Sequence, residues 1–249
     1  MSPAYLTPYD SDQPKRTQIA QAFDVIAHRY DRLNRVLSFG VDLRWRRRAI
    51  RHLSEAAPAR VLDVATGTAD LAIMTARALP QALVTGIDLS DNMLRIGRDK
   101  VSRSRMDDRV NLIQGDCLAL PFADATFDAA TAAFGVRNFE DISGGLTELC
   151  RVLKPGGLAV ILELSRPERE PARSLFLFYL RVLMPFLGRC LSGHAREYRY
   201  LPASVAAVPQ GAKMLALLQA AGLVACGFER YTLGACTCYT GRKPAPQRS

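Results

Sequence analysis

Between residues 60 and 164, short runs of branched apolar residues alternate with helical patterns, and this alternation restricts the fold more than any other feature. We expect five strands, at 60–65, 82–90, 110–116, 127–135 and 158–164. Helical spacing of apolar residues separates them, at 71–79, 91–103 and 141–153. Strands that alternate with helices form a parallel sheet with right-handed crossovers. The chain is therefore expected to have an α/β fold.

The alternation is interrupted after Pro167. An apolar segment at 174–188 and a polar stretch at 193–202 follow, and we interpret residues 165–205 as a lid inserted over the sheet edge. Helical spacing resumes at 209–220, and two closing strands after Gly222 bring the expected sheet to seven strands.

The N-terminal part of the chain has a different residue pattern. Residues 1–14 lack periodicity and are expected to form a flexible tail. A helix is expected at 17–32, and a second, basic helix is expected to begin at Asp42 as its N-cap. We therefore expect a helical cap at 15–56 within a single domain at 15–243, and a short tail at 244–249.

Charge and cysteine usage limit the class of protein. Lysine and arginine number 33 against 24 acidic residues, which gives a net charge of +9 and favours polyanionic partners. The six cysteines and three histidines show no metal-ligand spacing, so no metal is expected. Neither a secretory signal nor an apolar run of about 18 residues is seen, and a cytoplasmic location is expected.

The strongest chemical signal lies where the first two strands end. The first runs into TGTADLA, where small residues allow backbone N–H groups to approach a ligand at a helix N-terminus. Asp88 ends the next strand, at the position where α/β cofactor folds place an acid on a ribose diol. Each signal alone is weak, because such turns and strand-end acids are often structural.

Together with QGDCLALPF after the third strand, FDAATAAFG in the fourth and RVLKPGG before the fifth, this pattern resembles class I S-adenosylmethionine-dependent methyltransferases. These are Rossmann-like proteins with a seven-stranded, mostly parallel sheet. Longer blocks are similar to the UbiE/MenG quinone C-methyltransferases: residues 23–47, 61–73, 134–141, 151–167 and 198–205. The similarity runs from about Ala20 to Lys243.

The resemblance implies S-adenosylmethionine as cofactor and S-adenosylhomocysteine as product. It places the methionine and ribose parts at the turn around Gly67 and Thr68, and the ribose hydroxyls at Asp88. The cofactor-binding set that it implies is Asp63, Gly67, Thr68, Asp88, Asp116, Cys117 and Ala133. Asp116 and Cys117 would border the adenine, and Ala133 stands where many relatives have a small polar residue.

For the acceptor, the family implies a polyprenylated 1,4-quinol. Loss of a hydroxyl proton makes the adjacent ring carbon nucleophilic, so neither a metal nor a covalent intermediate is needed. Demethylmenaquinol, methylated to menaquinol, is the preferred substrate. The alternative is 2-polyprenyl-6-methoxy-1,4-benzoquinol of ubiquinone biosynthesis, or both.

Arg137, Asn138 and Tyr30 are the candidate catalytic residues. Arg137 is always charged, so we expect it to stabilise a phenolate or to organise a water rather than to act as the base. Tyr198 and Tyr200 are candidates for substrate binding, or for packing the lid. His28 and His194 are alternative bases by pKa, and Asp141 caps a helix or takes part in the site.

The basic helix at 42–53 and the apolar segment at 174–188 suit a lipid-tailed substrate and a transient contact with an anionic membrane surface. Trp45 among the arginines favours an interfacial role over a solvated face. The sequence leaves open whether the chain forms a homo-oligomer.

Two other classes compete with this interpretation. Methylation of nucleic acid is disfavoured because AAFGVRN stands where amino-methylating enzymes of this fold have D/N-P-P-Y/F. A non-enzymatic protein with a vestigial cofactor fold is suggested by Ala65 and Ala69, which replace glycines of the turn.

Overall fold

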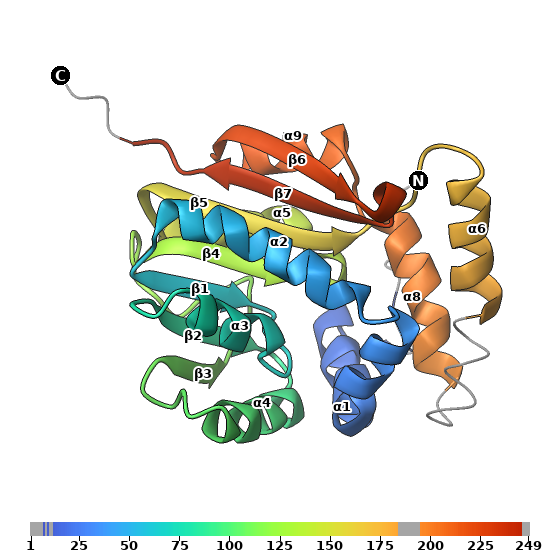
Figure 1. Ribbon diagram of the computed structural model, residues 1–249, viewed down its shortest axis with the longest axis horizontal. Helices are drawn as coiled ribbons and strands as arrows, with labels where there is room; N and C mark the ends of the chain where they lie inside the picture. Colours follow the sequence, from blue (N-terminus) through green and yellow to red (C-terminus); the bar gives the residue numbers. More distant parts are fainter. Residues whose placement is uncertain (1–6, 8, 10–11, 184–194, 246–249) are drawn as a thin grey trace.

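The computed structural model describes residues 7, 9, 12–183 and 195–245. Its centre is a seven-stranded sheet with the order β3-β2-β1-β4-β5-β7-β6, in which β7 alone among these strands runs antiparallel to both of its neighbours (Figure 1). The strands are β1 (Arg60–Val64), β2 (Leu83–Asp88), β3 (Val110–Gln114), β4 (Phe127–Ala133), β5 (Leu153–Leu164), β6 (Val224–Tyr231) and β7 (Cys236–Arg242). The expected α/β fold class with seven strands is confirmed.

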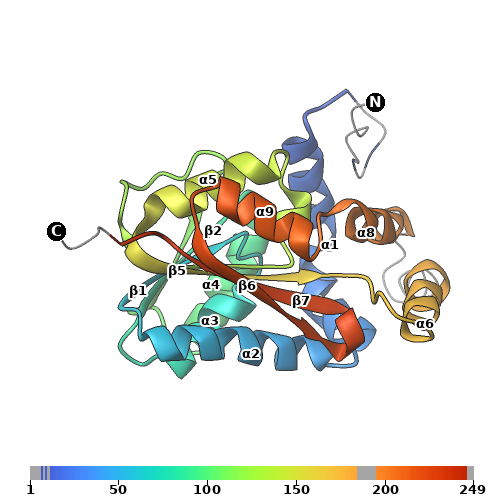
Figure 2. The same ribbon diagram turned by 90° about the horizontal axis from the view of Figure 1, so that it is seen from above.

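Helices cover both faces of the sheet (Figure 2). On one face lie α2 (Val41–Ala56), α3 (Asp70–Ala78) and α4 (Asp91–Arg103), and on the other lie α5 (Ile142–Val152) and α9 (Ala212–Ala220). Strand residues alternate between the two cores: Val61 packs with the first group and Leu62 with the second. Because both faces are buried, the strands are nearly continuous apolar runs, which is the pattern that the sequence shows.

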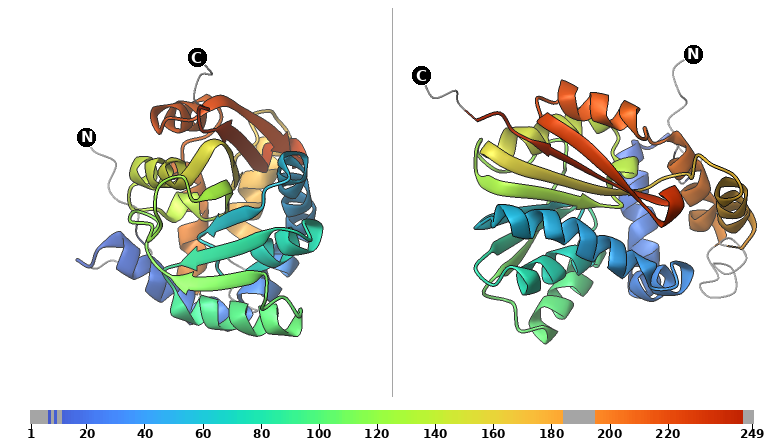
Figure 3. Two further views of the ribbon diagram at one scale, coloured as in Figure 1. Left: turned by 90° about the vertical axis from the view of Figure 1, so that its left-hand side faces the viewer. Right: turned by 45° about the horizontal axis from the view of Figure 1, so that its top comes forward.

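The strand order reverses between β1 and β4. β1 pairs with β2 on one side and with β4 on the other, both in parallel, so the connections on either side of this point run in opposite directions. Figure 3 shows the twisted strands with helices on both sides. In open α/β sheets the carboxyl ends of the strands at such a switch point leave a crevice where ligands bind.

Four further elements gather beyond the carboxyl ends of the parallel strands (Figures 1 and 3). They are α1 (Lys15–Leu37), α6 (Ala172–Phe178), the single-turn helix η2 (Tyr179–Leu183) and α8 (Ala195–Ala207). A small third core of Leu37, Leu180 and Val205 holds α1, η2 and α8 together. Shorter 3₁₀ turns, η1 (Val136–Asn138) and η3 (Thr232–Gly234), lie at the same end.

Two local expectations are wrong, and one helix was not predicted. In the polar stretch at 193–202 the chain is helical from Ala195, and α8 continues through Pro202 because Ser204 and Val205 beyond it are buried. Asp42 is not the N-cap of α2, which is Gly40 in a left-handed conformation. β5 begins at Leu153 rather than at 158, because Leu153 pairs with Phe127 before a bulge in the ladder.

No single helix among the described residues is both long and apolar enough to cross a membrane. By length and composition alone, the bent pair Tyr200–Ala207 and Ala212–Ala220 meets that criterion.

Candidate active site

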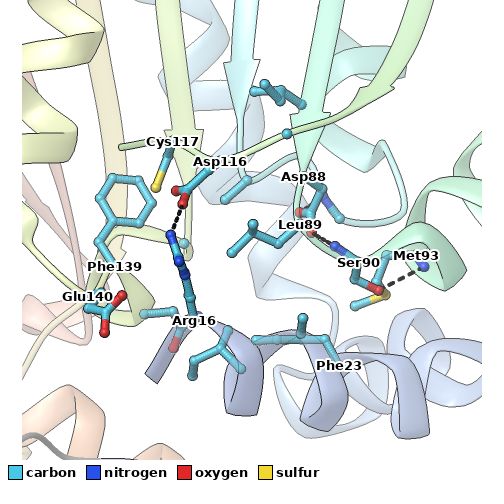
Figure 4. Close-up of a pocket in the computed structure, with 18 of the residues that line it drawn as sticks. Arg16, Phe23, Asp88, Leu89, Ser90, Met93, Asp116, Cys117, Phe139 and Glu140 are labelled. Atoms are coloured by element: carbon cyan, nitrogen blue, oxygen red, sulfur yellow. Dashed lines mark hydrogen bonds and ion pairs between the residues drawn. The ribbon is translucent and has the colours of Figure 1, made fainter. Parts of the chain in front are cut away.

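A cavity lies at the carboxyl ends of β1, β2 and β4, at the point where the strand order reverses. It contains about 760 Å³ of empty space, including its open mouth, and α1 lies over it. Figure 4 shows Asp88, Asp116 and Cys117 projecting into it from the ends of neighbouring strands, with Arg16 and Phe23 of α1 opposite. Of the predicted cofactor residues, this first cavity is lined by Gly67, Asp88, Asp116, Cys117 and Ala133.

Asp88 is held by backbone donors. Its carboxylate accepts hydrogen bonds from the N–H of Gly67 at 2.8 Å and from the N–H of Ser90 at 3.0 Å. Burial raises the pKa of Asp88, although these backbone donors act to lower it. Gly67 has a φ of +56°, and a Cβ there would meet no atom within 4 Å, so the turn is open toward the ligand space.

The turn after β1 contains two alanines in a backbone conformation that is unusual for alanine. Ala65 and Ala69, where the resemblance implies glycines in the broader class, both adopt positive φ, at 53° and 63°. A positive φ costs a non-glycine residue roughly 1–2 kcal/mol. Both alanines therefore hold a conformation that glycine adopts readily, at the cost of local strain of a kind found at functional sites.

Asp116 and Cys117 follow β3, at the end of the cavity opposite Ser90. Asp116 accepts a hydrogen bond from the N–H of Leu118 at 2.9 Å and faces the Arg16 guanidinium at 3.4 Å. Burial raises the pKa of the Cys117 thiol, so it is protonated at neutral pH. The ion pair with Arg16 was not expected from the sequence, because the two partners are 100 residues apart along the chain.

Asp63 and Thr68 do not line the cavity. Asp63 lies beneath the turn and accepts hydrogen bonds from the hydroxyls of Thr66 and Thr131, both at 2.7 Å. Burial raises its pKa to about 6. Thr68 is buried, and its hydroxyl donates to Asp31 and lies 3.1 Å from the Lys100 ammonium. As positioned here, both side chains support the turn.

Lys100 and Asp31 belong to a network that sequence analysis missed. The ammonium of Lys100 on α4 binds Asp31 of α1 at 2.6 Å and also the carboxylate of Asp70 at the start of α3. Arg35 joins Asp70 at 2.8 Å to Asp42 at 2.6 Å. These ion pairs fasten α1 to the helices next to the cofactor turn.

A second cavity adjoins the first and is larger, with about 1430 Å³ of empty space, including its mouth. Its walls come from α1, α2, α6, η2 and α8, and they are mostly apolar. Four residues line both cavities: Phe23, Tyr30, Phe134 and Asn138. Ligands bound in the two cavities would therefore be adjacent, and both would contact these four side chains.

Phe134 occupies a constrained position at this junction. It follows β4 with a φ of 60°, which is rare for a bulky residue. Its ring lies 6.2 Å from that of Trp45, and the Arg46 guanidinium lies 5.0 Å from its centre. A Cβ at the following Gly135 would lie 2.5 Å from the Cβ of Ala65, so glycine is needed there for the strand ends to approach.

Arg137 is buried in an ion pair with Glu163 of β5. Its Nη1 lies 2.8 Å from Oε1 of Glu163, and its backbone N–H donates to Oε2 at 3.1 Å. Burial acts to lower the pKa of Arg137, but the facing carboxylate outweighs it and raises that pKa above the ordinary value. Glu163 is an acid inside the otherwise apolar run LAVILEL, and that was the signal that could have identified it.

Several polar atoms around the second cavity lack partners. Within the described part of the chain, Nε of Arg137, Oδ1 of Asn138 and the hydroxyl of Tyr200 are buried without a hydrogen bond. All three residues line the second cavity. Buried polar atoms are almost always paired, so these three indicate a place for a polar ligand group.

Burial raises the pKa of Tyr30, and it raises that of Tyr200 to about 12. Both hydroxyls are therefore neutral at physiological pH and can donate hydrogen bonds. Arg137, Asn138, Tyr30 and Tyr200, which the sequence placed in the site, meet around the junction of the cavities.

Other candidates lie elsewhere. Tyr198 belongs to α8, but its side chain and the whole of His194 fall outside the described part of the structure. His28 is exposed, 3.0 Å from Arg95, and lines neither cavity. Asp141 is the N-cap residue of α5, although its side chain makes no capping hydrogen bond.

The expectation for Trp45 is wrong. Its side chain is buried against Phe134, and its indole N–H donates to the Thr232 hydroxyl at 2.9 Å. Residue spacing placed Trp45 among arginines, but the stripe it occupies on α2 faces the sheet.

Within the described ranges, no group of three or more histidine, cysteine or acidic side chains is arranged to hold a metal ion.

Solved structures share this fold. A methyltransferase from Thermotoga maritima, described as a possible histamine N-methyltransferase, superposes with a TM-score of 0.64 at 18% identity, covering 90% of this chain and 99% of that one. The [4+2]-cyclase SpnF superposes with a TM-score of 0.58 at 21% identity, covering 93% and 97%. The sheet order is the topology of class I S-adenosylmethionine-dependent methyltransferases, and the cavity lies at its switch point.

Within that class, the chain belongs to the ubiE/COQ5 methyltransferase family, whose pattern matches residues 11–243. A demethylmenaquinone methyltransferase from Porphyromonas gingivalis is 47% identical over 243 residues, 97% of this chain and 99% of the relative. One from Bacteroides fragilis is 44% identical over 96% and 97% of the two chains. A ubiquinone/menaquinone biosynthesis C-methyltransferase UbiE from Geobacter sulfurreducens is 44% identical over 92% and 90%.

Proposed function

We propose that this protein transfers a methyl group from S-adenosylmethionine to a ring carbon of demethylmenaquinol and so produces menaquinol. One observation carries the proposal: a cavity at the switch point, lined by Asp88 and Asp116, meets a larger, mostly apolar cavity at four shared residues. The names of the relatives from Porphyromonas and Bacteroides support this substrate.

The first cavity fits S-adenosylmethionine by its donors and acceptors. Asp88 and Asp116 offer carboxylate oxygens to hydroxyl and amine donors, and Leu89 and Phe139 add apolar surface for a ring. The open turn at Gly67 brings the backbone close to the ligand. When bound, the cofactor supplies an electrophilic methyl group on a sulfonium.

The second cavity supplies what a quinol needs. The unpaired atoms of Arg137, Asn138 and Tyr200 can bind its ring hydroxyls, while the apolar walls accept the ring and its tail. Because Asn138 and Tyr30 border both cavities, they would position a quinol ring in the second cavity against the ligand of the first. Catalysis then rests on proximity and orientation.

Arg137 carries the electrostatic part of the proposed mechanism. Its pKa is raised by Glu163, so it stays cationic and stabilises negative charge that develops on a quinol oxygen as the proton leaves. The raised pKa values of Tyr30 and Tyr200 make these residues hydrogen-bond donors to that oxygen rather than bases. The proton acceptor is then a water or the medium.

The ubiquinone precursor 2-polyprenyl-6-methoxy-1,4-benzoquinol is the second candidate substrate, supported by the name of the Geobacter relative. We further propose a cytoplasmic protein that needs no metal and makes transient contact with an anionic membrane, where prenylated quinols dissolve. Assembly into a homo-oligomer is compatible with this proposal.

An anaerobic assay with radiolabelled S-adenosylmethionine tests these proposals. Short-tailed demethylmenaquinol, the methoxybenzoquinol and bulk RNA are offered side by side, and each quinol is also tested in its oxidised form. Label in reduced demethylmenaquinol is expected. Label in RNA, or in no acceptor despite cofactor binding, would contradict the proposed function.

A further inference from the structure

Large apolar side chains are unevenly distributed over the described surface. Of the nine that are exposed there, six lie at the end of the molecule that holds α6 and the α1–α2 turn: Val36, Phe39, Leu175, Phe178, Val182 and Leu233. Leu83 and Val224, in contrast, lie where β2 and β6 begin, at the opposite end (Figure 1). We name the group of six the mouth patch.

The mouth patch lies on the segments that also supply the lining of the second cavity. Phe39 is 76% exposed and also lines that cavity. The other five members each lie within two residues of a cavity-lining residue, as Leu175 and Phe178 lie beside Phe176 and Tyr179. Phe39 therefore joins the apolar wall of the cavity to exposed apolar surface, and the other exposed apolar side chains gather on the same segments rather than being scattered singly.

Positive charge borders this patch. The same elements carry exposed arginines: Arg32 on α1, Arg44 and Arg47 on α2, and Arg173 on α6. Arg32 lies one helical turn before Val36 on α1, so the two side chains share a face of that helix. Of the acids on the segment before α6, Glu168 pairs with Arg230, whereas Glu170 accepts a hydrogen bond from the N–H of Ser174 and keeps its charge.

We propose that the mouth patch docks on the surface of an anionic lipid bilayer and opens the second cavity toward the lipid. An apolar surface bordered by arginines matches the boundary between acyl chains and anionic headgroups. A protein seated on the patch would cover the mouth through which a substrate must pass, whereas a bilayer delivers an apolar ligand there. The route of the substrate rests on the proposed function, but the docking itself does not.

Vesicle flotation without cofactor or substrate tests the docking. The full chain is mixed with phosphatidylcholine vesicles, with and without about a third phosphatidylglycerol. We expect the double variant L175S/F178S to lower partitioning into the anionic vesicles on the order of tenfold, because two exposed apolar side chains are lost. Neither residue lines either of the two cavities described above, and both are more than half exposed, so we expect folding to be preserved.

The matched control is L83S/V224S, which removes two similarly exposed apolar side chains at the opposite end and should leave flotation unchanged. For the charges, R44Q/R47Q should weaken binding to anionic vesicles alone, and the exposed pair R103Q/R105Q on the far side serves as its control.

The proposal is overturned if the wild-type chain does not float with anionic vesicles, or if both apolar pairs change flotation equally. It is also overturned if L175S/F178S converts a solution dimer to monomers with no change in flotation, which would make the patch an interface between copies. Methylation of a soluble, short-tailed quinol is measured separately. L175S/F178S should keep that activity, and its absence in the wild-type chain would contradict the proposed function but not the docking.

Discussion

The two cavities differ in how the protein satisfies their polar groups. In the first, Asp88 and Asp116 already accept backbone or guanidinium hydrogen bonds, and Asp63 beneath the turn is bonded to two threonines. In the second, Arg137, Asn138 and Tyr200 keep unpaired buried atoms. The first cavity is therefore preorganised by its own loops, whereas the second is completed by its ligand.

This contrast separates stability from binding. Residues of the first cavity should contribute to both, because their bonds exist before the cofactor arrives. The unpaired groups of the second cavity should lower the stability of the free protein. Hydrogen bonds to the bound substrate should offset this loss.

Arg137→Met should give the largest effect, a loss of about 3–5 kcal/mol in the free energy of unfolding, because Glu163 becomes a buried, unpaired charge. Adding Glu163→Gln should restore most of the stability. The neutral amide removes the buried charge and keeps an oxygen acceptor for one of the two backbone N–H groups, of residues 137 and 164, that donate to separate oxygens of the carboxylate. Urea unfolding and label transfer are measured on both variants, and turnover should stay low in each. Recovery of turnover in the double variant would show that Arg137 acts only structurally.

Asp63→Asn should change the pH dependence of stability. The folded-state pKa of Asp63 is about 6, above its unfolded value of 3.8, so the folded protein holds this proton more tightly. As pH rises through this window the unfolded state loses its proton first. Wild-type stability should therefore fall by roughly 3 kcal/mol relative to the variant, and the difference should be complete above pH 6. Parallel curves between pH 4.5 and 7.5 would contradict the assigned burial.

Asp88→Ala should raise the Kd for S-adenosylmethionine by roughly 10–100-fold, since charge-assisted hydrogen bonds to ligand hydroxyls are lost. Titration calorimetry measures the affinity. Asp99→Ala, at an exposed position on α4, is the matched control and should bind normally. An unchanged affinity for Asp88→Ala would remove Asp88 from the cofactor site.

Tyr200→Phe should have the smallest effect and the most specific one. The KM for the quinol should rise by a few-fold to about tenfold through loss of one hydrogen bond, while cofactor affinity is unchanged. Thermal unfolding of the free variant should be equal to or slightly above that of the wild type, because an unpaired hydroxyl is removed. A destabilised variant would mean that Tyr200 already has a partner in the free protein.

Features with local signals could be predicted from the sequence. The strands, the turn at Gly67 and the acid at Asp88 follow from patterns of a few residues, and the sheet order agrees with the class that they imply. Contacts between residues far apart along the chain could not be predicted. Trp45 was assigned to a surface because it stands among arginines, but the stripe it occupies faces Phe134 and Thr232.

The sequence by itself determined the alternation of strands and helices, the family and the residue types at the strand ends. Only the tertiary structure decided that Arg137 pairs with Glu163, that Thr68 faces Lys100 instead of the cavity, and that two cavities meet at Tyr30 and Asn138. The physical reason is how far apart along the chain the interacting residues lie. Backbone conformation responds to neighbours along the chain, whereas burial, pairing and cavity shape depend on segments that only folding brings together.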